Sequence, residues 1–179
     1  VSNISFGIPV LASIKDAADI VMDVHLMIEE PIRYVEAFHK AGADILNVHY
    51  EACEDVQATL DAIHKCGMKA GLTIKPATPV EVLKPYLDQA ELFLIMSVEP
   101  GKGGQSFIPE SLDKIRELRG LLNEKGLTAD VEVDGGIHLG NAKEVLEAGA
   151  NVLVAGSAVF KDNIAENVKG FMEILNENE

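Results

Sequence analysis

The chain has 179 residues, of which 47% are apolar and 25% charged, so it is long enough for one domain with a substantial core. A formal net charge of −14 argues against nucleic acid or an anionic membrane as a partner, and no apolar run approaches the roughly 18 residues of a membrane span. Cys53 and Cys66 fit no metal motif and are expected to be reduced thiols. With no signal-peptide pattern, these features predict a cytoplasmic protein.

Helical and strand patterns alternate along the whole chain. After a loop over 1–7, we predict helices over 8–16, 31–41, 56–65, 79–87, 110–125, 140–148 and 165–175, and strands over 20–27, 45–49, 68–74, 92–98, 129–133 and 151–155. Six strand–helix units predict a parallel sheet covered by helices. Periodicity leaves two architectures open, an open doubly wound sheet and part of a (β/α)₈ barrel, because six units are two strands short of barrel closure.

Glycines mark the ends of several predicted helices. Gly67 and Gly126 stand where a helix C-terminus favours glycine. The motif AGA(D/N) occurs at 41–44 and again at 148–151, each time between a helix and a strand. We therefore expect the same helix-to-strand turn at both places.

A glycine-rich loop follows the strand expected over 92–98. Three glycines occur within the four residues 101–104, and a helical pattern begins soon after them. Such a loop gives backbone N–H groups room to converge on an anion, although an ordinary strand–turn–helix connection would look the same. The loop matches neither the P-loop nor the dinucleotide fingerprint, so a nucleotide is not the expected ligand.

Two further glycine loops follow the last two strands. They contain Gly135-Gly136 and Gly156-Ser157, and in barrels the loops after the last strands commonly form a phosphate site. An anionic substrate needs such a local trap because the overall charge repels it. The residues expected to donate to a phosphate from three neighbouring loops are Gly101, Gly103, Gly104, Gly135, Gly136, Gly156 and Ser157.

His25 and Asp134 are the sharpest candidates for chemistry, because both lie near the carboxyl ends of predicted strands, where parallel sheets bind ligands. An imidazole and a carboxylate at one mouth are typical ligands of a first-row metal. A buried core histidine and an Asp-Gly turn residue are the alternative interpretations. Alternation places Asp23, His25 and Met27 on one face of the first strand, and Met27 and Met96 are core residues or an apolar wall of the site.

A series of motifs resembles the ribulose-phosphate 3-epimerase family and covers essentially the whole chain. The motifs are DVHLM at 23–27, AGAD at 41–44, HYEA at 49–52, GLTIKPATP at 71–79, LIMSVEPGKGGQSF at 94–107, VEVDGG at 131–136 and AGANVLVAGSAVF at 148–160. The resemblance implies a (β/α)₈ TIM barrel of which strands three to eight are present. The family's first two strands, with two metal ligands and one catalytic aspartate, have no counterpart, so unpaired edges, aggregation or loss of activity is expected of these residues alone.

The resemblance also implies the reaction, the inversion of C3 of D-ribulose 5-phosphate to give D-xylulose 5-phosphate. It makes Asp134 a catalytic acid–base and a metal ligand, and His25 a second ligand, with Zn²⁺ or Fe²⁺ as the metal and Mn²⁺ or Co²⁺ as alternatives. Met27 and Met96 would border the reacting carbons, while Gly101, Gly103, Gly104, Gly136, Gly156 and Ser157 would hold the phosphate. The expected partners are a small sugar phosphate and further copies of the chain in a homo-oligomer.

One residue departs from the family pattern. Lys102 stands where the family usually has an aromatic or other apolar residue, and we expect its side chain to point to water rather than to the phosphate. The alternatives in function are an allulose-6-phosphate 3-epimerase, another phosphate-binding barrel such as a hexulose-phosphate synthase, and a truncated barrel that binds phosphate without turnover.

Overall fold

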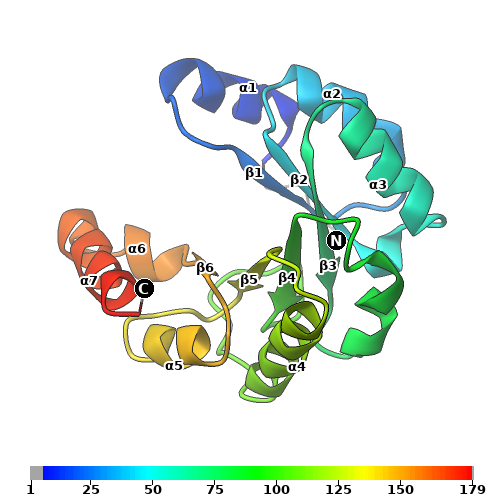
Figure 1. Ribbon diagram of the computed structural model, residues 1–179. Helices are drawn as coiled ribbons and strands as arrows, with labels where there is room; N and C mark the ends of the chain where they lie inside the picture. The colour runs from blue at the N-terminus through cyan, green and yellow to red at the C-terminus, as the bar shows by residue number, and fades with distance from the viewer. Residues whose placement is uncertain (1–5, 179) are drawn as a thin grey trace.

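A computed structural model describes residues 6–178, which form a curled six-stranded parallel sheet with helices on its outer side (Figure 1). The strands are β1 (Asp23–Leu26), β2 (Ile45–His49), β3 (Lys69–Ile74), β4 (Leu92–Met96), β5 (Asp130–Asp134) and β6 (Val152–Val154). The helices are α1 (Ile8–Ala17), α2 (Val35–Lys40), α3 (Val56–Lys65), α4 (Ser111–Glu124), α5 (Ala142–Glu147), α6 (Ser157–Phe160) and α7 (Ile164–Asn176). Three 3₁₀ helices are η1 (Pro31–Tyr34), η2 (Tyr50–Ala52) and η3 (Val80–Tyr86).

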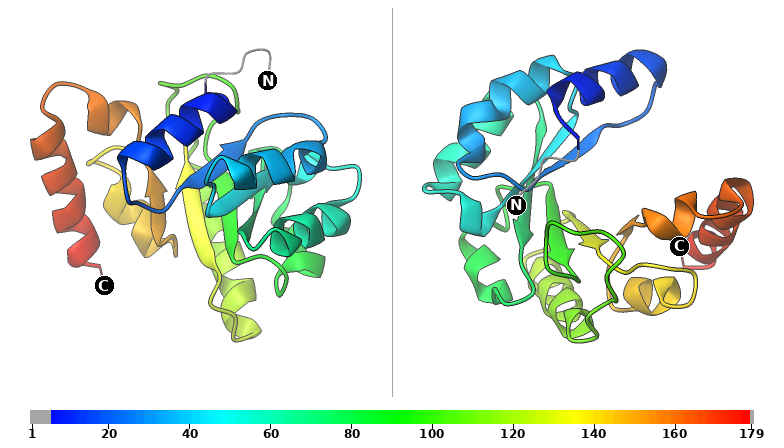
Figure 2. Two further views of the ribbon diagram at one scale, coloured as in Figure 1. Left: turned by 90° about the horizontal axis from the view of Figure 1, so that it is seen from above. Right: turned by 180° about the vertical axis from the view of Figure 1, so that it is seen from behind.

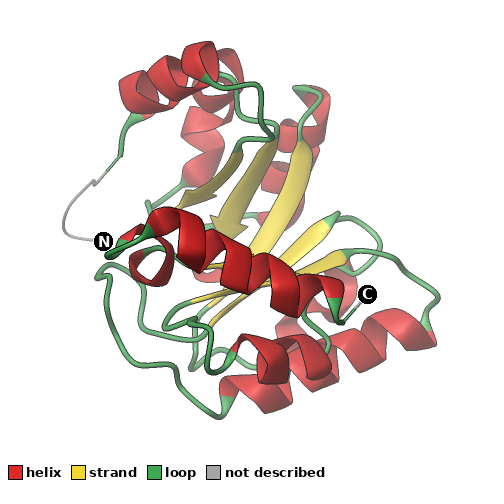
Figure 3. Cartoon of the chain, turned by 90° about the vertical axis from the view of Figure 1, so that its left-hand side faces the viewer, coloured by secondary structure: helices red, strands yellow, loops and turns green. Residues whose placement is uncertain are grey.

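Strand order decides between the two architectures that periodicity left open. The strands pair in chain order, β1-β2-β3-β4-β5-β6, and every pair is parallel. A doubly wound sheet reverses its strand order at a switch point, whereas a (β/α)₈ barrel keeps chain order. The fold is therefore the barrel type, and the views in Figures 2 and 3 likewise place the helices outside the sheet.

The barrel is open on one side. Within residues 6–178, β1 pairs only with β2 and β6 only with β5, and Figure 1 shows the α1 side and the α6–α7 side facing each other across the opening. Large apolar side chains are exposed near both edges, among them Val21 and Phe160. The expected unpaired edges are thus present in this part of the chain.

Most predicted elements are confirmed to within three residues, and β2 and α3 match their predicted bounds. The helix predicted over 79–87 is wrong in type, because η3 is a 3₁₀ helix. Pro85 lies inside it and has no N–H for an α-helical hydrogen bond. The helix predicted over 31–41 likewise begins as the 3₁₀ turn η1. The pattern did not reveal η2 and α6, which are too short for a period. The predicted loop over 1–7 falls mostly outside the described residues.

Local chemistry explains where α3 begins and ends. The carboxylate of Asp55 caps its start by accepting a hydrogen bond from the Ala58 N–H, at 2.9 Å. The chain leaves the helix through Gly67, whose φ of +82° is a conformation that glycine adopts without strain. The two AGA(D/N) motifs end α2 and α5 with the same left-handed glycine, at Gly42 and Gly149. The expected repeated turn is confirmed.

The two faces of the sheet carry different cores. The outer face packs against the helices and includes Leu46, Val48, Leu72, Ile74, Phe93, Ile95, Val131 and Val133. A separate inner cluster contains Leu92, Leu94, Met96 and Val98, with Met27 and Ile45 packed against it. Several of the remaining inner positions are polar, among them Asn47, His49 and Glu132, which makes the interior the place to look for chemistry.

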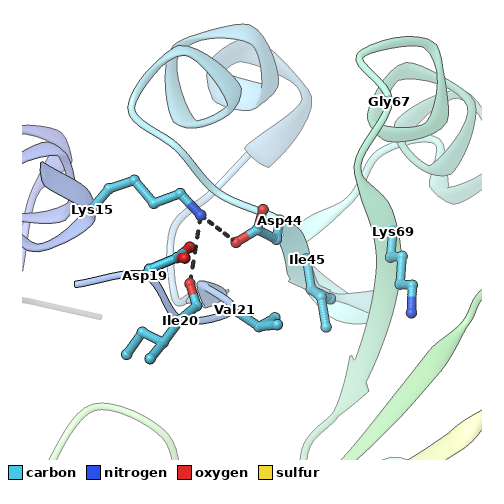
Figure 4. A pocket seen from close by; sticks show the side chains of 8 residues that line it. All are labelled: Lys15, Asp19, Ile20, Val21, Asp44, Ile45, Gly67 and Lys69. Carbon is cyan, nitrogen blue, oxygen red and sulfur yellow. Dashed lines mark hydrogen bonds and ion pairs between the residues drawn. The ribbon is translucent and has the colours of Figure 1, made fainter.

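A cavity of about 450 Å³ lies at the amino ends of the first strands, opposite the expected site. Lys15 crosses it to Asp44 with Nζ and Oδ2 2.8 Å apart (Figure 4). The same oxygen accepts the Met22 N–H at 2.8 Å, and the bond from Lys15 lowers the pKa of Asp44. Because this end of a barrel serves stability, we interpret the ion pair as a link between α1 and the start of β2.

No helix within residues 6–178 is long and apolar enough to cross a membrane.

Candidate active site

His25 and Asp134 meet across the interior of the barrel. His25 lies on β1 and Asp134 is the last residue of β5, two strands that are not neighbours in the sheet. The curl of the sheet nevertheless brings His25 Nδ1 to 3.7 Å from Asp134 Oδ2. Their side chains are 16% and 26% exposed, so a ligand can reach both. The predicted meeting of these two residues at one rim is observed.

His49 occupies the other side of the His25 ring. The two Nε2 atoms are 2.8 Å apart, and the rings stack with centroids 4.9 Å apart. His49 is the last residue of β2, and its side chain is only 4% exposed. Burial lowers the pKa of His49, although the nearby Glu51 carboxylate opposes this effect. Burial therefore favours the uncharged form of this imidazole.

Glu51 anchors the far end of His49. Its Oε2 is 3.4 Å from His49 Nδ1, and its Oε1 accepts hydrogen bonds from the Lys75 N–H, at 2.8 Å, and from the Thr78 hydroxyl. Burial opposes ionisation, but these hydrogen bonds prevail and lower the pKa of Glu51 to about 2. A carboxylate, two imidazoles and a second carboxylate thus form one continuous line, Glu51–His49–His25–Asp134.

A second polar group lies deeper in the barrel. Asn47 Nδ2 donates to Glu132 Oε2 at 2.9 Å and to Asp23 Oδ1 at 3.2 Å. Burial, followed by the charge of Asp23, raises the pKa of Glu132 to about 8. Gly71 makes room for this group, because a Cβ there would lie 2.0 Å from Asn47 Oδ1. A hydrogen-bonded carboxyl–amide cluster therefore occupies part of the interior below the rim.

The sequence pattern did not single out His49, Asn47 or Glu132 as site residues. In the sequence His49 stands out only as the end of a predicted strand and the start of the motif HYEA at 49–52. The available signal was the polar residue within an apolar strand, as in Ile45–His49 and in VEV at 131–133. Such residues must face a polar interior or a ligand, because an unpaired polar group in the outer core is costly.

The glycine loops line an open cavity of about 570 Å³, whose lining includes Gly136, two residues after Asp134. Its lining residues are Gly104, Gln105, Ser106, Phe107, Gly136, Ile137, His138, Asn141, Ser157, Ala158 and Lys161. It thus brings together the three loops that were predicted to share an anion. Gly136 has φ of +65° and touches the neighbouring loop so closely that a Cβ would lie 2.3 Å from the Phe107 nitrogen. Glycine at this position therefore allows the two loops to meet.

The other predicted site residues lie nearby, with some differences. Gly101, Gly103, Gly135 and Gly156 belong to the same three loops but do not line the cavity. Lys102 is exposed and also outside the lining, which agrees with a side chain in water. Met96 is buried and pairs in register with Asp134. Met27 packs against the same inner cluster as Met96.

Comparison with known proteins places this arrangement in a family. A family model described as "Ribulose-phosphate 3 epimerase family" matches residues 1–160. The chain is 49% identical over 161 residues to a ribulose-phosphate 3-epimerase of Bacillus subtilis (strain 168), covering 89% of the chain and 74% of that protein. It is 51% identical over 173 residues to one from Synechocystis sp., covering 95% and 75%.

Solved structures share the fold at lower sequence identity. A 3-hexulose-6-phosphate synthase from Salmonella typhimurium aligns with a TM-score of 0.72 at 18% identity, over 97% of this chain and 82% of that one. Orotidine 5'-phosphate decarboxylase from Pyrococcus horikoshii OT3 aligns with a TM-score of 0.70 at 16% identity, over 95% and 81%. These likenesses concern the fold alone, whereas the family match and the relatives near 50% identity establish kinship. The chain belongs to the ribulose-phosphate 3-epimerase family.

Proposed function

We propose that this chain carries out metal-dependent interconversion of D-ribulose 5-phosphate and D-xylulose 5-phosphate by proton transfer at C3. The observation that carries the proposal is the His25–Asp134 pair, 3.7 Å apart, beside a cavity formed by three glycine loops. Relatives that are 49% and 51% identical bear the name of this activity. The reaction requires acid–base groups next to an anion-binding site, and Asp134 would supply one of them.

His25 and Asp134 would hold the metal. Their nitrogen and oxygen donors suit Zn²⁺ or Fe²⁺, with Mn²⁺ or Co²⁺ as alternatives. Two such ligands of a tetrahedral ion lie roughly 3.4 Å apart, close to the observed 3.7 Å. Within residues 6–178 no group of three His, Cys, Asp or Glu side chains is placed to hold an ion. His25 and Asp134 would therefore supply only part of the ligand set of the metal. When bound, a divalent ion would stabilise negative charge on a substrate oxygen.

Asp134 would exchange the C3 proton on one face of the sugar. The ketone at C2 makes that proton acidic, and a carboxylate within reach can remove it and return it. Inversion needs a second acid on the opposite face, and no residue within 6–178 is assigned to that role. The partial exposure of the Asp134 side chain leaves it accessible to the substrate.

The glycine cavity would bind the phosphate of the substrate. Backbone N–H groups of glycine-rich loops bind anions well because no side chain prevents close approach. Lys161 contributes a cation to the lining, in a chain whose net charge of −14 otherwise repels the substrate. Asp134, Gly135 and Gly136 are consecutive, so the end of β5 connects the proton-transfer site to the phosphate site.

Replacing Asp134 by Asn tests the catalytic assignment. The protein is incubated with D-ribulose 5-phosphate in D₂O, and deuterium at C3 and D-xylulose 5-phosphate are followed by NMR. We expect Asp134→Asn to slow exchange at least about 100-fold, the usual contribution of a positioned acid–base group, while circular dichroism stays unchanged. Exchange at the wild-type rate would remove Asp134 from the reaction.

The same assay separates the alternative functions. A hexulose-phosphate synthase would form an aldol product from formaldehyde and ribulose 5-phosphate, and an allulose-6-phosphate epimerase would prefer the six-carbon substrate. A chain that binds inorganic phosphate but catalyses no exchange would be a binding barrel without turnover. Each of these results would replace the proposed reaction.

A further inference from the structure

The two ring nitrogens of His25 face different groups. Nδ1 faces Asp134 Oδ2 at 3.7 Å, and Nε2 faces His49 Nε2 at 2.8 Å. A neutral imidazole has one N–H and one lone pair, so only one of these nitrogens can accept or bind a cation. The chemistry available at the rim therefore depends on which nitrogen carries the proton.

The contact between the two histidines allows two arrangements. One proton lies between the two Nε2 atoms, and either His25 donates it to His49 or His49 donates it to His25. In the first arrangement the Nδ1 lone pair of His25 faces Asp134, where it can bind a cation. In the second, Nδ1 carries a hydrogen towards Asp134 and cannot be a ligand.

A carboxylate faces Nδ1 at each end of this line, and an ionised carboxylate accepts hydrogen bonds and donates none. Only Glu51 is within hydrogen-bond distance of its imidazole, at 3.4 Å, whereas Asp134 lies 3.7 Å from His25, so Glu51 decides between the arrangements. It lies 3.4 Å from His49 Nδ1 and is held by the Lys75 N–H and the Thr78 hydroxyl. His49 must then carry its proton on Nδ1, which leaves its Nε2 as an acceptor. His25 consequently donates from Nε2.

We propose that Glu51, acting through His49, fixes His25 in the tautomer whose Nδ1 lone pair faces Asp134. Glu51 and His49 are positioning residues in this scheme, because neither reaches the rim as a ligand. The arrangement lengthens the usual carboxylate–histidine support of a metal-binding imidazole by one histidine. Its consequence for metal binding rests on the proposed function, but the tautomers themselves do not.

Long-range ¹H–¹⁵N NMR of metal-free protein labelled with ¹⁵N-histidine measures the tautomers directly. We expect the proton on Nδ1 of His49 and on Nε2 of His25. In Glu51→Ala we expect His49 to lose its preference for the Nδ1 proton. The conservative Glu51→Gln keeps an acceptor oxygen and should retain much of the preference. A proton on Nε2 of His49 in the wild-type protein would overturn the proposal.

Zn²⁺ affinity, measured by competition with a chromophoric chelator, supplies a second readout. Loss of such a supporting partner typically costs 10- to 100-fold in metal affinity, and we expect a loss in that range for Glu51→Ala. The control is Glu54→Ala, three residues away and exposed. Equal affinities for these two variants would also overturn the proposal.

Thermal unfolding of each variant identifies any that fail to fold, and Glu51→Gln keeps the test possible if Glu51→Ala does not fold. The outcome is independent of the reaction assay. If Asp134→Asn retained exchange, the proposed function would fail while the measured tautomers still decided the role of Glu51.

Discussion

Glu132 shows how the barrel interior changes the behaviour of a single side chain. It is 4% exposed, shares the Asn47 amide with Asp23, and lies two residues before Asp134. Burial, then the charges of Asp23 and Asp134, raise its pKa to about 8, against 4.5 for an ordinary glutamate. Near neutral pH this carboxyl is therefore largely protonated in the folded chain and ionised in the unfolded chain.

This difference predicts a pH dependence of folding. A raised pKa contributes stability that is fully present below about pH 4.5 and is lost as the pH rises through about 8. Glu132→Gln is neutral at every pH, so wild-type stability should fall relative to the variant between pH 5 and pH 8. We expect a change of about 1 to 4 kcal/mol, since each tenfold change in proton affinity corresponds to about 1.4 kcal/mol.

Urea denaturation at pH 5 and pH 8 measures this change. The control is Glu124→Gln at the exposed end of α4, for which the difference from wild type should be the same at both pH values. If the difference between wild type and Glu132→Gln were also independent of pH, Glu132 would be ionised in the folded protein.

At the scale of elements, α4 holds the loop that leads from β3 to η3. Lys114 Nζ donates to the backbone oxygens of Lys75 at 2.8 Å, Pro76 at 3.0 Å and Thr78 at 2.6 Å. Burial lowers the pKa of this lysine, although the nearby Glu51 and Glu117 charges oppose the effect. The loop in turn provides the Lys75 N–H and the Thr78 hydroxyl to Glu51, so α4 supports the rim through one ammonium group.

Replacing Lys114 by Met should therefore destabilise the fold. Methionine keeps most of the apolar stem but leaves three carbonyl groups without their donor, which we expect to cost about 2 to 3 kcal/mol. Arg116→Met on the same helix is the control, because Arg116 forms only an exposed pair with Asp113 worth about 0 to 1 kcal/mol. Equal midpoints for the two variants in guanidinium denaturation would contradict this role of Lys114.

Comparison of the predicted and observed elements shows which features of the fold the sequence pattern predicts. The bounds of α3 and β2 are predicted to the residue, because turn residues and apolar patterns act locally. The 3₁₀ form of η3 is not predicted, because the pattern shows a helix but not the effect of Pro85 on its hydrogen bonds. The short α6 is not predicted, since a single turn has no period to detect. The expectation that His25 and Asp134 share an edge follows from strand polarity. Their contact, and the Asn47–Glu132 bond, depend on which strands face each other across the interior.

At the scale of the molecule, packing is strongest in the middle of the sheet. Nearly every residue of β3 and β4 is buried, whereas all three residues of β6 are partly exposed. Among the described residues, α7 has a single buried side chain, Phe171, and α1 has none. Local opening is easiest where few apolar groups are buried, so stability should decrease from the centre towards both edges.

Hydrogen–deuterium exchange followed by mass spectrometry tests this gradient. We expect the slowest exchange in peptides covering β3 and β4, and exchange faster by at least about tenfold in those covering β6, α7 and α1, since each 1.4 kcal/mol of local stability corresponds to a factor of ten. Uniform protection across the six strands would mean that the sheet opens only as a whole.

The contact between β1 and β5 has a mechanical consequence. These strands share no backbone hydrogen bonds, so the separation of His25 and Asp134 reports how tightly the sheet is rolled. An ion or sugar that bridges the two side chains would tie the first strand to the fifth. Part of its binding free energy would then oppose unrolling of the sheet. The bound ligand would therefore stabilise the barrel that forms its own binding site.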